Sequence, residues 1–313
     1  MTLTLSREDV AALMAPHDYI DITAGAFAAL SEGRVVSPMP MHVPAEGGGF
    51  HAKAAMLAGD EPLFALKLNG NFPGNPARGL PTIQGVIVLS RADDGRVLAV
   101  MDSMEVTLRR TAAATAVAAR RLARPDSRTV TVVGCGEQAE AQIRALAAVL
   151  PLQRVHAVDR DPAQAAGLAK RLSDLGLEVA PGDLADCARS DVVVTCTPAT
   201  APFLGPAHVS PGTFVAAVGA DSSEKAELEP GLMAAASKVV CDVSAQCAVM
   251  GDLRSAIESR VMTAEDVHAD LGEVVRGSRP GRETTDEVIV FDSTGVAVQD
   301  LAAAAELWRR AVA

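Results

Sequence analysis

A glycine-rich turn between two β-branched runs carries the most specific chemistry in this sequence. Residues 130–133 (VTVV) predict a short strand, residues 134–139 (GCGEQA) follow it, and apolar residues then recur at helical spacing as far as Leu150. In such a turn the first glycine permits a tight bend, the second lets the backbone approach a pyrophosphate, and a small third residue packs the helix against the strand. Free N–H groups at the start of the helix attract phosphate. The stretch therefore predicts a dinucleotide site; the alternative is a structural turn that binds nothing.

An acidic residue, Asp159, ends the second β-branched run at residues 155–158. Its carboxylate is placed to accept hydrogen bonds from the 2′- and 3′-hydroxyls of a ribose, and it would repel a 2′-phosphate. This position favours NAD over NADP, but the neighbouring Arg160 leaves NADP open. Cys135, inside the turn, could be a nucleophile; a small residue beneath the phosphate is the simpler interpretation.

Two further residues have chemical potential, and each also has an ordinary structural explanation. Lys67 stands late in an apolar strand, just before a glycine-rich loop, where a lysine commonly extends its ammonium to the surface. Asp221 follows the apolar run at residues 213–218, at the kind of strand end where ligands of parallel sheets bind. An acid there is also a common helix N-cap or loop residue. The residues alone do not decide whether Lys67 and Asp221 are functional or structural.

The elements that position these residues fall into two groups. The first 101 residues predict two helices and then strands in series, which implies an antiparallel or mixed sheet. A loop at residues 69–76 is so rich in turn formers that no regular structure is expected there. After residue 128 strands and helices alternate, which predicts a doubly wound parallel sheet. A helix over residues 107–122 joins the two groups, and because Arg109 and Arg110 lie near its N-terminus, at least one of them is expected to have an anionic partner.

The composition excludes several classes of protein. The chain has 313 residues, a net charge of −11 and 3% aromatic residues, which argues against nucleic acid and anionic membranes as partners. Its five cysteines are scattered without C-x-x-C spacing, so neither a disulfide framework nor a metal site is predicted. It contains no apolar run of about 18 residues, the length that would predict a membrane span. A soluble cytoplasmic protein of two domains is expected.

Taken together, the motifs resemble those of the ornithine cyclodeaminase/mu-crystallin family over nearly the whole chain. The segments that carry the resemblance are LK at 66–67, FPGN at 72–75, GLPT at 79–82, RTAA at 110–113, GCGEQA at 134–139, VGAD at 218–221, EL at 227–228 and FDSTG at 291–295. The resemblance implies an α/β fold with a Rossmann-type doubly wound parallel sheet. It also implies a discontinuous α/β substrate-binding and dimerisation domain with a mixed, largely antiparallel sheet. We expect that domain at residues 1–112, completed by 290–313, the NAD-binding domain at 113–289, and a homodimer.

The same resemblance assigns roles to individual residues. Lys67 and Arg110 would hold the carboxylate of an amino or imino acid, with Lys67 at the catalytic centre, and Asp221 would be the general acid or base for the amine. The residues implied at the cofactor are Thr82, Thr111, Gly134, Gly136, Glu137, Gln138, Asp159, Arg160, Thr197, Val218, Lys225 and Ser293.

Two departures from the family pattern bear on the substrate. The first strand lacks the arginine that relatives often carry after its proline, and residues 49–53 lack the glutamate that cyclodeaminases tend to have. Lys53, on a strand face shared with His51, could replace the missing arginine. The expected function is an NAD-dependent oxidoreductase acting at the α-carbon of a small L-amino acid or cyclic imino acid. The alternatives are an ornithine-type cyclodeaminase, with NAD used catalytically, and a mu-crystallin-like binding protein without turnover.

Overall fold

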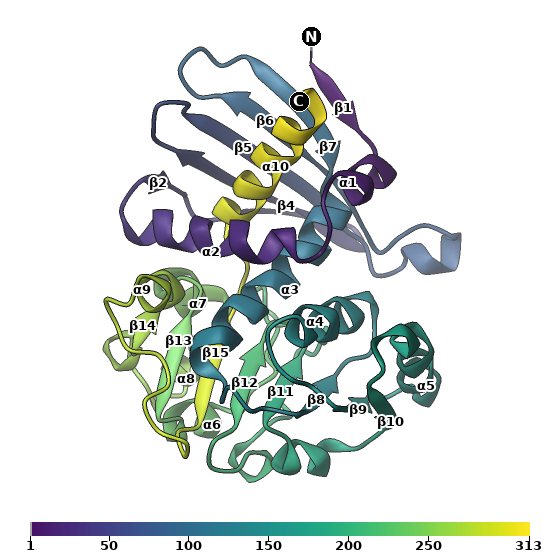
Figure 1. The fold of residues 1–313 in the computed structure, drawn as a ribbon, viewed down its shortest axis with the longest axis vertical. Coiled ribbons are helices and arrows are strands. Elements are labelled where there is room, and N and C mark those ends of the chain that lie inside the picture. Colours follow the sequence, from purple (N-terminus) through teal and green to yellow (C-terminus); the bar gives the residue numbers. More distant parts are fainter. Residues whose placement is uncertain (1) are drawn as a thin grey trace. The chain divides into compact units, whose positions relative to one another are not determined.

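The computed structural model describes residues 2–313 as two compact units (Figure 1). Unit 1 comprises residues 1–110 and 296–313, and unit 2 comprises residues 111–295. The expected boundary at residue 290 falls inside a strand, β15 (Ile289–Asp292), and β15 pairs within the sheet of unit 2. The chain therefore stays in unit 2 until Gly295 before it returns to unit 1.

Unit 1 is built on a seven-stranded sheet with the path β1-β7-β6-β5-β4-β2, and β3 pairs with β4. Only β1 and β7 are parallel; every other pair in this sheet is antiparallel, which confirms the predicted mixed sheet. The strands are β1 (Leu3–Leu5), β2 (Val35–Val36), β3 (Met41–Ala45), β4 (Gly48–Leu57), β5 (Leu63–Asn71), β6 (Ile83–Arg91) and β7 (Val97–Asp102).

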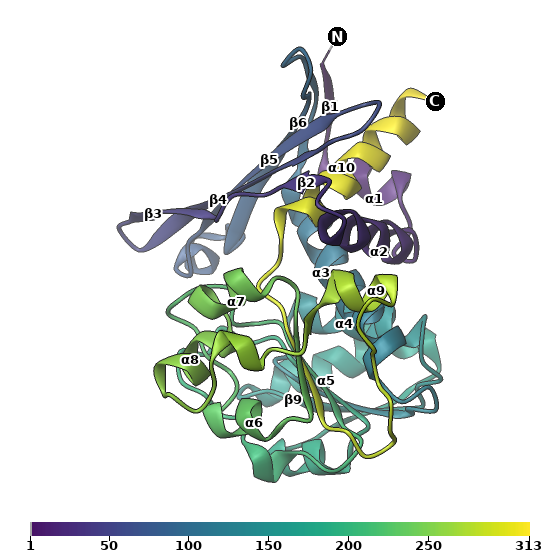
Figure 2. The same cartoon turned by 90° about the vertical axis from the view of Figure 1, so that its left-hand side faces the viewer.

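Helices cover one face of this sheet and leave the other face bare (Figure 2). The alternation along β5 explains the asymmetry, because Leu63, Ala65 and Lys67 are buried beneath helix α10 while Leu68 is exposed on the opposite face. The helices of the unit are α1 (Arg7–Leu13), α2 (Asp18–Ser31), α10 (Ala297–Val312) and the first part of α3 (Ser103–Leu122).

Two local predictions for unit 1 were wrong. The turn-rich segment at 69–76 was expected to be irregular throughout, but β5 continues to Asn71, and Asn69 pairs with Gly85. The local sequence disfavours a strand here, but pairing with β6 supplies backbone hydrogen bonds that keep the segment extended. Helix α3 begins at Ser103 rather than at residue 107, because Asp102 Oδ1 accepts the N–H groups of residues 104 and 105.

Unit 2 contains an eight-stranded sheet in the order β10-β9-β8-β11-β12-β15-β13-β14, and every pair in it is parallel. The predicted doubly wound sheet is therefore confirmed. The chain order reverses between β8 and β11, and ligands of such sheets bind outside the carboxyl ends of the strands at such a point. The strands are β8 (Thr129–Val133), β9 (Arg154–Val158), β10 (Glu178–Pro181), β11 (Val192–Thr195), β12 (Phe214–Ala217), β13 (Lys238–Cys241), β14 (Ala269–Asp270) and β15.

The central strands of this sheet are buried along their whole length. Every residue of β11, β12, β13 and β15 is buried, as expected where helices cover both faces of a parallel sheet. The helices are the remainder of α3 with α4 (Glu137–Ala147), α5 (Pro162–Arg171), α6 (Pro230–Ala235), α7 (Ser244–Met250), α8 (Asp252–Glu258) and α9 (Leu271–Arg276). No helix in residues 2–313 is long and apolar enough to span a bilayer.

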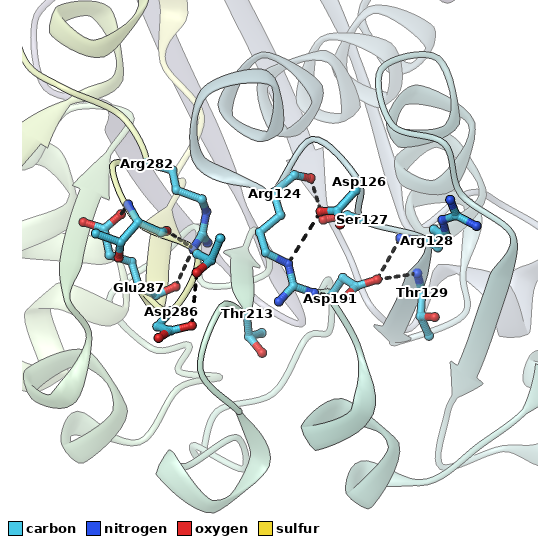
Figure 3. A network of polar contacts seen from close by, with 12 residues as sticks. Arg124, Asp126, Ser127, Arg128, Thr129, Asp191, Thr213, Arg282, Asp286 and Glu287 are labelled. Atoms are coloured by element: carbon cyan, nitrogen blue, oxygen red, sulfur yellow. Dashed lines mark hydrogen bonds and ion pairs between the residues drawn. The ribbon is translucent and has the colours of Figure 1, made fainter.

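A polar network joins the amino ends of the central strands of unit 2 (Figure 3). Asp191, just before β11, accepts the N–H groups of Arg128 and Thr129 at 2.7 and 2.9 Å and pairs with Arg124. Arg282 donates to the carbonyls of Leu122 and Glu287, both at 2.7 Å. Groups at this edge of the sheet bond to one another, and ligands of parallel sheets gather at the opposite, carboxyl edge.

Candidate functional site

Two cations and one carboxylate form a buried triad in unit 1. Lys67 on β5 and Arg110 on α3 both contact Asp300 on α10: Lys67 Nζ lies 2.7 Å from Oδ2, and Arg110 Nε lies 3.1 Å from Oδ1. The side chains of Lys67 and Asp300 are only 4% and 2% exposed. Lys67 therefore does not extend to the surface. The anionic partner that the sequence predicted for Arg109 or Arg110 is, for Arg110, the carboxylate of Asp300. Arg109 pairs separately with Glu105 at 2.8 Å.

The charges of the triad do not cancel. Burial, reinforced by the Arg110 guanidinium, lowers the pKa of Lys67 to about 7. Burial alone would raise the pKa of Asp300, but the charges of Lys67 and Arg110 outweigh it and hold that pKa below its ordinary value. Two cations share one carboxylate, so the protonated triad keeps one net positive charge with little access to water. Such a site attracts a monoanion.

Lys53 adds a third cation close to the triad. It lies directly opposite Lys67 in the register of β4 and β5, and its charge contributes to the lowered pKa of Lys67. No acid stands at residues 49–53 of β4, where cyclodeaminases tend to have one. The local electrostatics of unit 1 thus suit a carboxylate better than a second ammonium group.

The glycine turn of unit 2 connects β8 to α4, and its two glycines serve different purposes. Gly134 has φ +90°, and a Cβ there would lie 2.8 Å from the carbonyl oxygen of Cys196. The protein's own packing thus requires this glycine. Gly136 has φ −75°, and no described atom lies within 4 Å of where its Cβ would stand. The fold itself does not need a glycine there, and the open space suits the close approach of a pyrophosphate.

Other groups at this turn also fit a dinucleotide. Asp159 Oδ2 accepts the N–H of Cys135 at 2.7 Å, so the acid at the end of β9 lies against the turn. Its carboxylate has acceptor sites left for ribose hydroxyls. The buried Nε2 of Gln138 has no hydrogen-bond partner among residues 2–313. Glu137 and Arg160 are exposed beside these groups.

Four more of the expected residues follow the neighbouring strands β11 and β12. Thr197 lies after β11 and touches the glycine turn, since a Cβ at Gly134 would lie 2.9 Å from Thr197 Cγ2. Val218 follows β12 and is buried. Asp221 is 53% exposed at its side chain, and Lys225 Nζ lies 2.6 Å from its Oδ1. The structure therefore pairs the expected general acid or base with a residue that was expected to contact the cofactor.

The remaining three expected cofactor residues are held in different settings. Ser293 follows β15, is buried, and donates its hydroxyl to Asp242 at 3.1 Å. Thr111 is half-buried on α3 in unit 2. Thr82 belongs to unit 1, where its carbonyl accepts the N–H of Phe72.

Three buried residues that anchor the site were given no role from the sequence, although Glu227 lies in one of the segments that carry the family resemblance. Asp300 completes the triad, and Gln299 beside it accepts from Arg110 Nη1 at 3.3 Å. Glu227 accepts the hydroxyl of Thr197 at 2.7 Å. The available signal was a charged residue inside an apolar pattern, as in Ala226-Glu227-Leu228 and in the buried stripe of the terminal helix.

One cluster in the described chain has the composition of a metal site. Ligand atoms of Cys241, Cys247 and Asp292 lie within 4.8 Å of one another and are fully buried. Asp292 already accepts the N–H groups of residues 252 and 253, and burial holds the pKa of the Cys247 thiol well above its ordinary value. These groups are occupied as hydrogen-bonding partners of the fold.

Comparison with known proteins identifies relatives over the full length of the chain. The model of the ornithine cyclodeaminase/mu-crystallin family matches residues 1–313. Alanine dehydrogenase of Archaeoglobus fulgidus is 35% identical over 311 residues, which cover 99% of this chain and 95% of that protein. An archaeal alanine dehydrogenase dimer with bound NAD superposes with a TM-score of 0.95 at 35% identity, covering 99% of this chain and 96% of that one. The Δ1-pyrroline-2-carboxylate reductase of Thermococcus litoralis, solved with NADH and L-proline, also has a TM-score of 0.95, at 28% identity over 99% of this chain and 98% of that one.

Proposed function

Because the chain belongs to the ornithine cyclodeaminase/mu-crystallin family, we propose that it is an NAD-dependent oxidoreductase acting at the α-carbon of a small L-amino acid or cyclic imino acid. The observation that carries the proposal is the buried triad, in which Lys67 and Arg110 share the single carboxylate of Asp300. One uncompensated positive charge in a desolvated site is the complement of one substrate carboxylate. The relatives named above, an alanine dehydrogenase and a pyrroline-2-carboxylate reductase, act on compounds with such a group.

Each proposed role follows from the charge of the group. Lys67 and Arg110 bind the substrate carboxylate and fix the orientation of the α-carbon, and Lys53 strengthens this binding in place of an arginine. Asp221 accepts a proton from the substrate ammonium as the amino acid becomes an imine, and it returns a proton in the reverse direction. Lys225, at 2.6 Å, balances the charge of the Asp221 carboxylate until the substrate arrives.

The cofactor would be held by unit 2. Gly136, Glu137 and Gln138 would contact the pyrophosphate, Asp159 the ribose hydroxyls, and Thr197, Val218 and Ser293 the remaining part. When bound, NAD accepts hydride from the α-carbon or donates hydride to it. The acid at 159 supports NAD over NADP, and the exposed Arg160 is the residue through which NADP could be accommodated. Thr82, Thr111 and Lys225 remain candidates for the same cofactor.

A homodimer is part of the proposal, and its support is the bare face of the unit 1 sheet. Met41, Val43, Phe50, Leu68 and Val86 share that face and are each more than 40% exposed. An apolar patch of this kind on a sheet commonly marks an interface between proteins. We assign it to a second copy of this chain, which makes unit 1 the dimerisation and substrate domain and unit 2 the NAD-binding domain. A reducing, cytoplasmic location is proposed as well, since all five cysteines are free.

The test is absorbance at 340 nm with the purified protein, NAD or NADH, and a panel of L-amino acids and cyclic imines. A steady change with one compound, lost in Asp221→Asn, supports the oxidoreductase and identifies its substrate. If 340 nm stays flat while ammonia is released from ornithine or lysine, the protein is a cyclodeaminase that recycles its cofactor. Tight NADH binding without either signal would instead support a binding protein.

A further inference from the structure

The carboxylate of Glu227 joins the carboxyl ends of two neighbouring strands in unit 2. It accepts hydrogen bonds from Thr195 Oγ1, Thr197 N and Thr197 Oγ1, each at 2.7 Å, and from the N–H of Gly219 at 2.8 Å. Thr195 is the last residue of β11, and Gly219 stands two residues beyond the end of β12. Glu227 itself is fully buried. One side chain therefore fixes the two backbone segments that contain Thr197 and Val218.

The packing around this carboxylate leaves it no freedom. A Cβ at Gly219 would lie 2.5 Å from Glu227 Cδ and 2.4 Å from the carbonyl oxygen of Thr197. On the other side, a Cβ at Gly134 would lie 2.8 Å from the carbonyl oxygen of Cys196. Residues 195–197 therefore lie close against the first glycine of the dinucleotide turn.

A second carboxylate holds Glu227 in place from behind. Asp252 Oδ1 accepts the N–H groups of Glu227 and Leu228 at 2.8 and 2.9 Å, so the backbone at 227 is fixed independently of its side chain. No lysine or arginine in residues 2–313 forms an ion pair with Glu227, which is satisfied by neutral donors alone. Burial, together with the charge of Asp252, raises the pKa of Glu227 to about 7. The titratable groups that face it are Asp252 on α8 and the Cys196 thiol after β11.

We propose that Glu227 is a positioning residue of the NAD site, which clamps the ends of β11 and β12 so that Thr197 and the backbone at 218–219 are fixed for the cofactor. This inference rests on the function proposed above. It adds a residue that contacts neither substrate nor cofactor and acts through Thr197 and Gly219. As a carboxylate Glu227 accepts all four hydrogen bonds. A protonated or amidated side chain can keep its place only if a threonine hydroxyl turns from donor to acceptor or a backbone N–H loses its partner, and either change loosens the clamp.

The experiment measures NADH binding by the fluorescence of NADH, together with the melting temperature, in the full-length protein. The variants are Glu227→Gln and Thr195→Val, which removes one donor to Glu227 without touching an expected cofactor residue. Asp191→Asn is the matched control: it removes a carboxylate with several donors at the amino edge of the same sheet. We expect Glu227→Gln to weaken NADH binding about tenfold, Thr195→Val to weaken it less, and Asp191→Asn to lower only the melting temperature.

The pH profile gives a readout that a purely structural role would not change. NADH affinity of the wild type should fall as the pH drops below about 7, as Glu227 takes up a proton, and the profile of Glu227→Gln should be flat over the same range. The inference is overturned if Glu227→Gln loses thermal stability as Asp191→Asn does but keeps wild-type NADH affinity and pH dependence. If Glu227→Gln does not fold, unchanged NADH affinity in Thr195→Val overturns it. A wild-type protein that binds no NADH would refute the proposed function itself.

Discussion

Lys53 and Lys67 stand directly opposite each other on the adjacent antiparallel strands β4 and β5. Like charges in this position are destabilising. The charge of Lys53 adds to the lowering of the Lys67 pKa that burial and the Arg110 guanidinium cause. Only one carboxylate, Asp300, lies within ion-pair distance of Lys67 in the described chain. A substrate carboxylate would relieve this repulsion, and the free energy released would contribute to binding.

Replacing Lys53 tests that idea directly. Lys53→Met keeps the length of the aliphatic stem and removes the charge, so the KM for a carboxylate substrate should rise several-fold with little change in kcat. Arg91→Met, in the same sheet, removes a half-buried cation paired with Asp93 and should leave the KM unchanged. An unchanged KM in Lys53→Met would show that Lys53 does not replace the arginine missing from the first strand.

The pH dependence of substrate binding should report the charge of Lys67. Its pKa lies at about 7, so the ammonium is charged below that pH and neutral above it. The KM for the substrate should therefore rise between about pH 6 and pH 9, over the range in which the charge is lost. Lys67→Arg keeps a permanent charge at this position and should flatten the profile, even where its absolute activity is low. If the KM of Lys67→Arg changes with pH as steeply as in the wild type, the pH dependence does not come from the charge of Lys67.

Unit 2 should become less stable as the pH rises through the mildly acidic range. Burial raises the pKa of Glu227 from 4.5 to about 7 and that of Asp252 from 3.8 to about 6. Between those values the folded protein holds protons that the unfolded chain has released, so the free energy of unfolding falls as pH increases from about 4 to about 7. Lys67 contributes the opposite slope above about pH 7, because its folded pKa of about 7 lies below its ordinary 10.5 and the unfolded chain holds the proton there.

Urea unfolding at pH 5, 6, 7 and 8 measures this effect. Asp252→Asn retains the Oδ1 acceptor for two backbone N–H groups and removes the buried acid, so it should reduce the slope of stability against pH. Asp191→Asn should leave the slope as in the wild type. A wild-type protein whose stability increases from pH 5 to pH 7 would contradict the raised pKa values.

The two glycines of the turn should respond differently to alanine. Gly136→Ala has room and an ordinary φ, so the fold should be retained or stabilised by up to about 1 kcal/mol while NADH binding weakens. Gly134→Ala combines φ +90° with contacts under 3 Å and should destabilise unit 2 whether or not NADH is present. Melting curves with and without NADH separate these effects. Full NADH affinity in Gly136→Ala would indicate that the open space is not used by the cofactor.

The bare face of unit 1 should control assembly. Leu68 and Val86 pair directly across β5 and β6, and each is 42% exposed. Val86→Asp should give a monomer by light scattering coupled to size exclusion, because an unpaired carboxylate would be buried in the interface. Val249→Asp, at an exposed apolar residue of unit 2, is the control and should remain dimeric. A dimeric Val86→Asp would place the interface elsewhere.

The parts of the site that depend on local sequence could be predicted, and those that depend on remote partners could not. The turn at 134–139 and the acid at 159 belong to one strand–helix–strand unit, so their spacing alone indicates their arrangement. Asp300 and Glu227 owe their importance to partners remote in the sequence, such as Arg110, which lies 190 residues before Asp300. No local pattern shows which charge a buried acid will meet. Lys67 is an example, because a single lysine in an apolar strand can either extend its ammonium to the surface or form a buried ion pair. The sequence does not distinguish the two.

The extended part of β5 and the boundary at β15 were missed for the same reason. Asn69 and its neighbours have low strand propensity, and only pairing with β6 keeps them extended. Residues 289–292 form a strand that either sheet could have accepted on hydrophobicity alone. Its place between β12 and β13 follows from the topology of the whole unit.

The return of the chain to unit 1 has a consequence for its biosynthesis. Asp300 emerges 190 residues after Arg110, and at roughly 5–20 residues per second this interval lasts on the order of 10–40 s. Throughout that time the nascent chain holds Lys67 and Arg110 without their shared counter-charge, while all of unit 2 is being translated. Unit 2 can complete its sheet on the ribosome as soon as β15 has emerged, but unit 1 has to wait for α10. Lys67 and Arg110 are therefore buried last, and a chain arrested before residue 300 should expose unit 1 to proteolysis while unit 2 is already protected.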